Sequence, residues 1–86
     1  MPLRLNVASE RLDAVAAAFA GLSRAQGEKL FSAEKVFVNG RTVTDRSARL
    51  KDGDTLSVRG FGKAVYDGIE YETKRNRLWV RLRKLI

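Results

Sequence analysis

The hydrophobic pattern of this chain changes its period once, near residue 35, and this change limits the folds that the chain can adopt. Before residue 35, apolar residues recur at helical spacing in two segments. After it, short apolar runs are separated by turns that contain glycine and asparagine. Two helices followed by several strands predict an α+β fold, in which two N-terminal helices pack on a small antiparallel sheet.

The first predicted helix follows Ser9, a residue type that favours the N-cap position. Glu10 and Asp13 place negative charge in its first turn, which suits the positive end of the helix dipole. Gly21 is expected to end this helix in a left-handed conformation. Residues at the spacing of one apolar helix face are Leu12, Val15, Ala16, Phe19 and Ala20.

The second predicted helix begins with a capping box, in which Ser23 and Gln26 have the S-x-x-Q spacing. We expect this helix to run to Ala33. Gly27 lies inside it, where glycine costs about 1 kcal/mol relative to alanine. The residues expected to point inward are Leu30 and Phe31.

Strands are expected after residue 35, beginning with a hairpin. Asn39-Gly40 is the strongest short hairpin signal, and it is flanked by residues 36–38 and 41–44. Asp52-Gly53 predicts a second turn. Further strands are expected at residues 55–59, 64–71 and 77–83, with a short strand or extended lead-in at residues 3–7. We expect four or five of these segments to form the sheet.

Composition excludes several kinds of site. The chain has 86 residues and is expected to form one domain over residues 1–86. It contains no cysteine and no histidine, so the commonest metal ligands and the commonest general base are absent. We therefore expect no metal, no cofactor and no enzyme activity. No apolar run approaches the roughly 20 residues that cross a bilayer, and we expect a cytoplasmic or organellar protein without a membrane partner.

The net charge of +7 is spread unevenly along the chain. Residues 1–73 contain 11 basic and 10 acidic residues, whereas residues 74–86 contain six basic residues and no acidic one. Such asymmetry favours an anionic polymer as the partner. Nucleic acid is therefore the leading partner, with a solvated basic tail as the alternative.

A series of short motifs in these elements resembles the S4 domain, which is also called the alpha-L RNA-binding domain. The matching residues are Arg11-Leu12-Asp13, Leu22-Ser23-Arg24, Leu30, Val36, Val38-Asn39-Gly40, Val43 and Asp52-Gly53-Asp54-Thr55-Leu56. Residues 57–63 and 72–74 look like the C-terminal part of the YlmH-like branch of that family. The resemblance implies an alpha-L core at about residues 9–58, followed by a basic C-terminal hairpin at about residues 63–86.

This resemblance also implies the partner. S4 domains bind structured RNA, mainly ribosomal RNA and tRNA, and the YlmH-like branch is associated with the large ribosomal subunit. YlmH-like proteins usually carry a further N-terminal domain, so we expect either an excised domain or a stand-alone relative. We expect a monomer. The family often has glycine before the first strand after the helices, where this chain has Glu34-Lys35.

The RNA face that the resemblance implies comprises the start of the first helix, the second helix and the hairpin. The residues at these positions are Arg11, Ser23, Arg24, Gln26, Lys29, Lys35, Asn39 and Arg41. Arg24 is the leading phosphate contact, because a helix start attracts anions and a guanidinium binds phosphate bidentately. The alternatives are an ion pair of Arg24 with Glu28 and one of Arg11 with Asp13.

Basic residues in the second half of the chain are expected to extend this surface. They are Arg59, Lys63, Lys74, Arg75, Arg77 and Arg81. On the last strand, Trp79 alternates with Leu78 and Val80, so it shares a face with Arg77, Arg81 and Arg83. Trp79 either stacks on an RNA base or covers the core, and the pattern leaves both open.

A protein-interaction module of the β-grasp type, without RNA as its ligand, is the alternative function. Its support is the combination of Val38-Asn39-Gly40, Asp52-Gly53-Asp54 and an apolar strand, which also occurs in sulfur-carrier folds. Those carriers react through a C-terminal Gly-Gly, whereas this sequence ends with Arg83-Lys84-Leu85-Ile86. That difference counts against a carrier.

Overall fold

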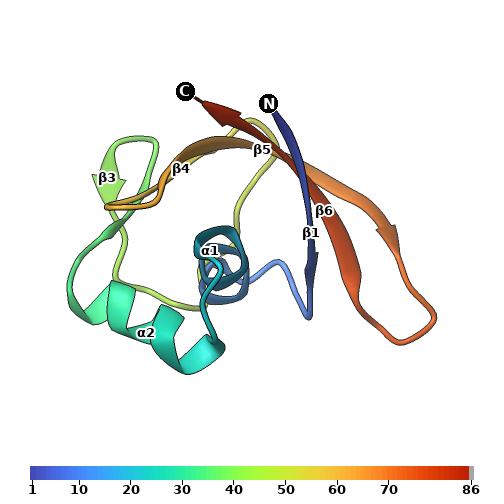
Figure 1. Ribbon diagram of the computed structural model, residues 1–86, viewed down its shortest axis with the longest axis horizontal. Coiled ribbons are helices and arrows are strands. Elements are labelled where there is room, and N and C mark those ends of the chain that lie inside the picture. Colours follow the sequence, from blue (N-terminus) through green and yellow to red (C-terminus); the bar gives the residue numbers. More distant parts are fainter. Residues whose placement is uncertain (86) are drawn as a thin grey trace.

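The computed structural model describes residues 1–85 and contains two helices on one face of a six-stranded antiparallel sheet (Figure 1). The elements are β1 (Pro2–Val7), α1 (Leu12–Ala20), α2 (Arg24–Ser32), β2 (Val36–Val38), β3 (Arg41–Thr42), β4 (Thr55–Val58), β5 (Gly62–Glu72) and β6 (Leu78–Leu85). The strand order across the sheet is β1-β6-β5-β4-β2-β3. The predicted α+β fold with an alpha-L core is confirmed.

The sheet has six strands, so the prediction of four or five was too low. The difference comes mainly from the N-terminal segment, which pairs with β6 as the edge strand β1. Pro2 lies opposite Arg83 and Val7 lies opposite Leu78 in this pairing. The two ends of the chain therefore lie side by side (Figure 1), and the C-terminal hairpin gains a third strand. The last residue of the predicted hairpin, Ile86, lies outside the described residues.

The start of α1 differs from the prediction. The helix begins at Leu12 with Arg11 at the N-cap, and no side chain caps it. Carbonyl groups of the loop between β3 and β4 accept its first hydrogen bonds, from Leu12 N to Ala48 at 2.7 Å and from Asp13 N to Arg46 at 3.1 Å. Ser9 was wrongly predicted as the N-cap, because a loop more than 30 residues away supplies the acceptors that a capping side chain would otherwise offer.

The two helices approach each other at Gly27. A Cβ atom at this position would lie 2.6 Å from the Cβ of Ala17, so only glycine allows this separation. The close approach of the two helices therefore requires glycine at position 27, despite its low helix propensity. Gly21 ends α1 with a φ of 70°, as predicted.

The core lies between the helices and the inner face of the sheet. Leu12 and Val15 of α1 meet Val36, Leu56 and Val80 there, and all five are 1% exposed or less. The alternation in β6 is confirmed: Val80 and Leu82 are buried, and Leu78 packs against the core.

The phenol of Tyr66, on β5, is the largest polar group in this core. Its side chain is fully buried, and its hydroxyl donates a 2.8 Å hydrogen bond to Glu10, which precedes α1. Burial and the neighbouring carboxylate both raise the pKa of Tyr66 above its ordinary value. This hydrogen bond joins the sheet to the segment that leads into the helices.

Trp79 lies on the outer face of the sheet, opposite Tyr71 of β5 and Asn6 of β1. It is partly buried, but it is not part of the core. The guanidinium of Arg4 lies 5.0 Å from the centre of its ring. Trp79 therefore does not cover the core, and an arginine already occupies one side of the ring.

Candidate nucleic-acid interface

Four arginines gather where α1 begins, because the loop between β3 and β4 folds back over the helix start. Arg11 forms an isolated antiparallel bridge with Arg49. The backbone of Arg46 contacts Asp13, and the side chain of Arg24 reaches the same aspartate from α2. We call Arg11, Arg24, Arg46 and Arg49 the arginine cluster. The backbones of Arg46 and Arg49 and the side chains of Arg11 and Arg24 thus meet at the start of α1.

Asp13 holds two arginines of this cluster in place. Its side chain is only 3% exposed, and it accepts hydrogen bonds from Arg24 at 3.0 Å and from Arg11 at 3.3 Å. The backbone N–H of Ala14 donates a third, at 2.8 Å. Both arginine side chains remain about half exposed, and each guanidinium has more N–H donors than its contact with Asp13 uses. Two arginines on one buried carboxylate leave one excess positive charge. The carboxylate also holds both guanidinium groups in a defined orientation.

The predicted capping box at the start of α2 is confirmed. Gln26 N donates to Ser23 Oγ and Ser23 N donates to Gln26 Oε1, both at 3.1 Å. These two side chains therefore have a structural role at the positive end of the helix dipole. Arg24 is the first residue of this helix, and the capping box fixes the backbone from which its side chain extends.

The expected alternative partner of Arg24 was wrong. Glu28 pairs with Arg46 of the loop, at 3.0 Å, and Arg24 pairs with Asp13. The alternative pairing of Arg11 with Asp13 is present. The sequence reasoning missed Arg46 and Arg49 as members of a cationic surface. Their only local signal was basic charge in a loop, which does not indicate where the loop lies.

Ser47 shapes this loop. Its hydroxyl donates to Asp45 at 2.7 Å and its backbone N–H donates at 2.9 Å, and these two hydrogen bonds lower the pKa of Asp45. The Asp45 carboxylate therefore ends a tight turn beside the arginine cluster. This turn aims the carbonyl groups of Arg46 and Ala48 at the start of α1.

A second basic group lies around the β2–β3 hairpin and the β4–β5 turn. Arg59 stacks on Phe37, with 5.7 Å between guanidinium and ring centre, and its backbone N–H donates to Lys35. Asn39 has a φ of 53°, and its amide bridges Asp54 and Thr55 at 3.0 and 2.9 Å. The Asn39 side chain therefore fastens the hairpin. The remaining predicted residues of this region, Arg41 and Lys63, are exposed.

The arginines of β6 are largely neutralised by acids of β5. Arg83 pairs with Asp67 at 2.9 Å, and Arg81 lies 3.8 Å from Glu70, which also binds Arg4 at 2.6 Å. The sequence has no acidic residue after residue 73, but pairing across the sheet brings two acids onto this face. The outer face is therefore less cationic than the charge distribution along the chain indicates.

Arg77 differs from the other arginines of the C-terminal segment. Its Nε donates to the side-chain oxygen of Asn6, and a terminal nitrogen donates to the Asn6 carbonyl at 3.2 Å. Among residues 1–85, no carboxylate pairs with Arg77. Its full positive charge therefore remains beside β1. Lys74 and Arg75 lie in the exposed turn before it.

The predicted contact residues do not all come together. Arg11 and Arg24 share Asp13, and Lys29 is exposed on the same helix as Arg24. The β2–β3 hairpin and the β5–β6 turn lie toward opposite ends of the longest axis (Figure 1). Across the described part of the chain, no cluster of acidic side chains is arranged to bind a metal ion. Neither helix there has the length and apolar character that a membrane span requires.

Two comparisons with known proteins bear on this surface. A family model described as the S4 domain matches residues 10–56, the segment that contains both helices, the arginine cluster and the first hairpin. The chain is also 41% identical over 72 residues to Ribosome-associated protein quality control protein P2 of Bacillus subtilis. The aligned region is 84% of this chain and 28% of that relative. The chain thus spans less than a third of the length of this curated relative.

Proposed function

This chain belongs to the S4 domain family, and on that basis we propose that it binds structured RNA, either ribosomal RNA or tRNA, through contacts with phosphates. The observation that carries the proposal is the arginine pair on Asp13, with one guanidinium 3.0 Å and the other 3.3 Å from the carboxylate. Preoriented guanidinium groups at the start of a helix match the geometry and charge of a phosphate. This surface recognises the shape of an RNA backbone rather than a base sequence.

We further propose that the RNA belongs to the ribosome, with the large subunit as the partner. The name of the Bacillus relative describes a ribosome-associated protein, and 84% of this chain aligns with it. The proposed contacts are the arginine cluster, Ser23, Gln26 and Lys29 near α2, and Lys35, Asn39 and Arg41 near the hairpin. Arg59, Lys63, Lys74, Arg75, Arg77 and Arg81 extend the basic surface.

The salt dependence of affinity tests RNA binding. If about five to seven phosphates are contacted, log K for a ribosomal RNA fragment falls with log salt at a slope near −4 to −6. Fluorescence anisotropy with a labelled fragment, over a series of potassium chloride concentrations, measures this slope. A response that is flat with salt contradicts the proposal.

Removing two charges tests the location of the interface. We expect R24A/K29A to weaken binding at least tenfold and to make the slope shallower by about 2, since each lost phosphate contact removes about one released counterion. The matched control is K51A/K84A, which removes two charges from exposed positions outside the proposed contacts. Equal losses in both variants would show that only the overall charge matters.

A further inference from the structure

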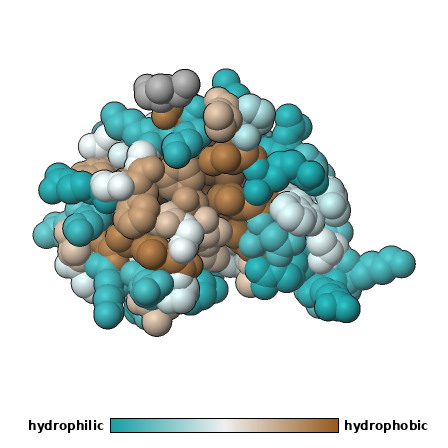
Figure 2. Space-filling model, in the orientation of Figure 1, coloured by the Kyte–Doolittle hydropathy of each residue, from teal (hydrophilic) through white to brown (hydrophobic). Residues whose placement is uncertain are grey.

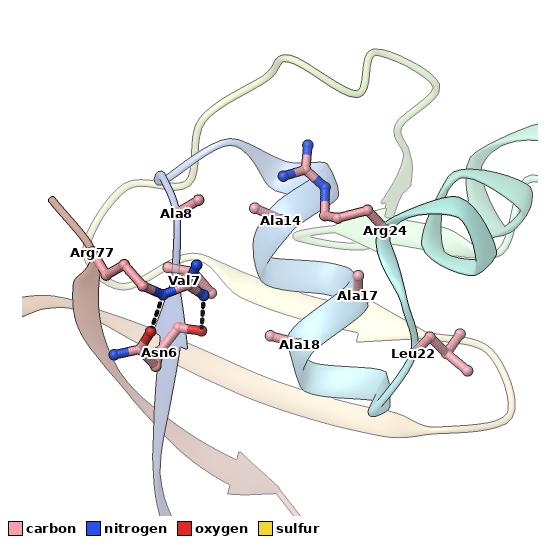
Figure 3. Close-up of a pocket in the computed structure, with 9 residues that line it drawn as sticks. All are labelled: Asn6, Val7, Ala8, Ala14, Ala17, Ala18, Leu22, Arg24 and Arg77. Carbon is pink, nitrogen blue, oxygen red and sulfur yellow. Dashed lines mark hydrogen bonds between the residues drawn. The ribbon is translucent and has the colours of Figure 1, made fainter. Parts of the chain in front are cut away.

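A hollow of about 230 Å³ lies between α1 and β1, and its lining combines small apolar side chains with Asn6 and two arginines. Val7, Ala14 and Ala17 are buried beneath it, and Ala18 and Leu22 border it. In Figure 3 the methyl groups of Ala14 and Ala18 point from α1 toward β1. Figure 2 shows apolar surface in the middle of this side of the molecule, surrounded by hydrophilic residues. Small alanine side chains therefore leave a recess between α1 and β1 that is open to solvent.

The charged residues that line this hollow are two arginines, Arg24 and Arg77. Arg24 begins α2 and Arg77 directly precedes β6, 53 residues later, and the two lie on different sides of the hollow (Figure 3). Two other hollows on the surface each include at least one carboxylate, Glu70 in one and Glu34 in the other. The hollow between α1 and β1 thus combines a lining of mixed polarity with two charged residues that are both cationic.

We propose that this hollow binds the base of one unpaired RNA nucleotide, while Arg24 and Arg77 contact the phosphates on its two sides. The inference rests on the RNA binding proposed above, and it specifies an unpaired nucleotide as the RNA element that binds in the hollow. A bulged or looped nucleotide carries a base with apolar faces and polar edges between two negative phosphates, so its charge and its mixed polarity match the hollow. A fully paired helix cannot insert a base without first breaking a pair.

The size of the hollow fits this ligand. Its volume of about 230 Å³ is below the roughly 300–1,000 Å³ of pockets for drug-sized molecules, so it has room for one base. The two arginines are also suited to such a contact. Arg77 has no acidic partner among residues 1–85, and Arg24 shares Asp13 with Arg11, so both can add a phosphate contact without losing their present hydrogen bonds.

Two RNA hairpins that differ by a single bulged nucleotide test the inference. We expect the protein to prefer the bulged hairpin on the order of tenfold over the fully paired one, because only the unpaired base can enter the hollow and bury its faces there. Filling the hollow with A18L, or removing a rim charge with R77Q, reduces this preference to less than about twofold. With 2-aminopurine as the bulged base, binding changes the fluorescence of the wild-type complex and leaves that of the A18L complex nearly unchanged.

Matched variants separate this effect from general losses of charge or stability. K51Q removes one charge from an exposed position outside the proposed contacts and keeps the preference for the bulge. A25L adds the same side chain to an exposed position of α2 and also keeps it. Equal affinity of the wild-type protein for both hairpins overturns this inference while leaving RNA binding intact. Binding to neither hairpin at low salt overturns the proposed function as well. If both A18L and R77Q kept the preference for the bulged hairpin, this hollow would not be the binding site of the unpaired base.

Discussion

Three residues other than glycine have positive φ angles in the described chain. Their residue types differ in how readily they adopt this left-handed backbone conformation. Asn39 and Asn76 have φ angles of 53° and 60°, and asparagine accepts this region more readily than most residues. Glu34 has a φ of 56° between α2 and β2, where its charged side chain is exposed. S4 domains often have glycine before this strand, and a left-handed backbone is the physical reason for glycine there.

We expect E34G to stabilise the protein by about 0.5–1 kcal/mol. Glycine removes the left-handed strain of roughly 1–2 kcal/mol, and part of this gain is offset by the larger entropy of the unfolded chain. Urea unfolding measures the change. E34A is the control, because alanine keeps the strain and is expected to give no gain. A stability of E34G at or below that of E34A would contradict the assignment of strain to Glu34.

At the scale of elements, the two helices meet through a glycine and an alanine. Gly27 and Ala17 are both buried, and there is no room for a second methyl group between them. The angle and separation of α1 and α2 determine how Arg24 reaches Asp13 across the helix pair. The contact between small residues therefore supports the arginine cluster as well as the core.

We expect G27A to destabilise the protein by about 1–3 kcal/mol, although alanine has the higher helix propensity. The added methyl group would force α1 and α2 apart. The double variant A17G/G27A relieves the clash, so it is expected to be more stable than G27A alone. Chemical denaturation of the four proteins in this cycle measures the coupling. A stabilising G27A would show that the helices separate without cost.

At the scale of the whole molecule, one hydrogen bond joins the sheet to the segment entering the helices. Tyr66 on β5 donates to Glu10 across 56 positions of the sequence, and the phenol is buried in the core. The folded state therefore keeps this hydroxyl protonated to a higher pH than the unfolded chain does, since burial and Glu10 raise its pKa.

This difference predicts a loss of stability in alkali. Below pH about 10, Tyr66 is protonated in both states and its contribution is complete. Above that pH the unfolded chain loses the proton while the folded protein retains it, so the free energy of unfolding falls as pH rises. We expect the advantage of wild type over Y66F, about 1–3 kcal/mol at pH 8, to shrink between pH 10 and 11. Urea unfolding of both proteins across this range measures it. An advantage that stays constant above pH 10 would contradict the buried phenol as its source.

The surface charge also belongs to the scale of the whole molecule. Along the chain the positive excess lies in residues 74–86, but in the folded protein Asp67 and Glu70 offset Arg83 and Arg81 on the outer sheet face. Near the helices, by contrast, Arg11 and Arg24 share the single charge of Asp13, and beside β1 Arg77 has no acidic partner among residues 1–85. We therefore expect the side that carries the arginine cluster to dominate RNA binding.

Local features were predictable because neighbouring residues determine them. The capping box of Ser23 and Gln26, the left-handed end at Gly21 and the turn at Asn39-Gly40 each depend on a few consecutive residues, and all three are confirmed. The alternation that buries Val80 and exposes Arg81 is likewise a property of the strand itself. Short patterns therefore predicted the order and type of most elements.

The sequence by itself thus determined two helices, the glycine end of the first and the capping box of the second, together with the hairpins and a basic chain of the S4 type. Only the tertiary structure decided that the loop after β3 replaces Ser9 at the start of α1, that Asp13 serves two arginines, and that Arg77 lies across a hollow from Arg24. These contacts join segments far apart in the chain. Local periodicity carries no information about them, because the partner of a charge or of a helix end is set by packing of the whole fold.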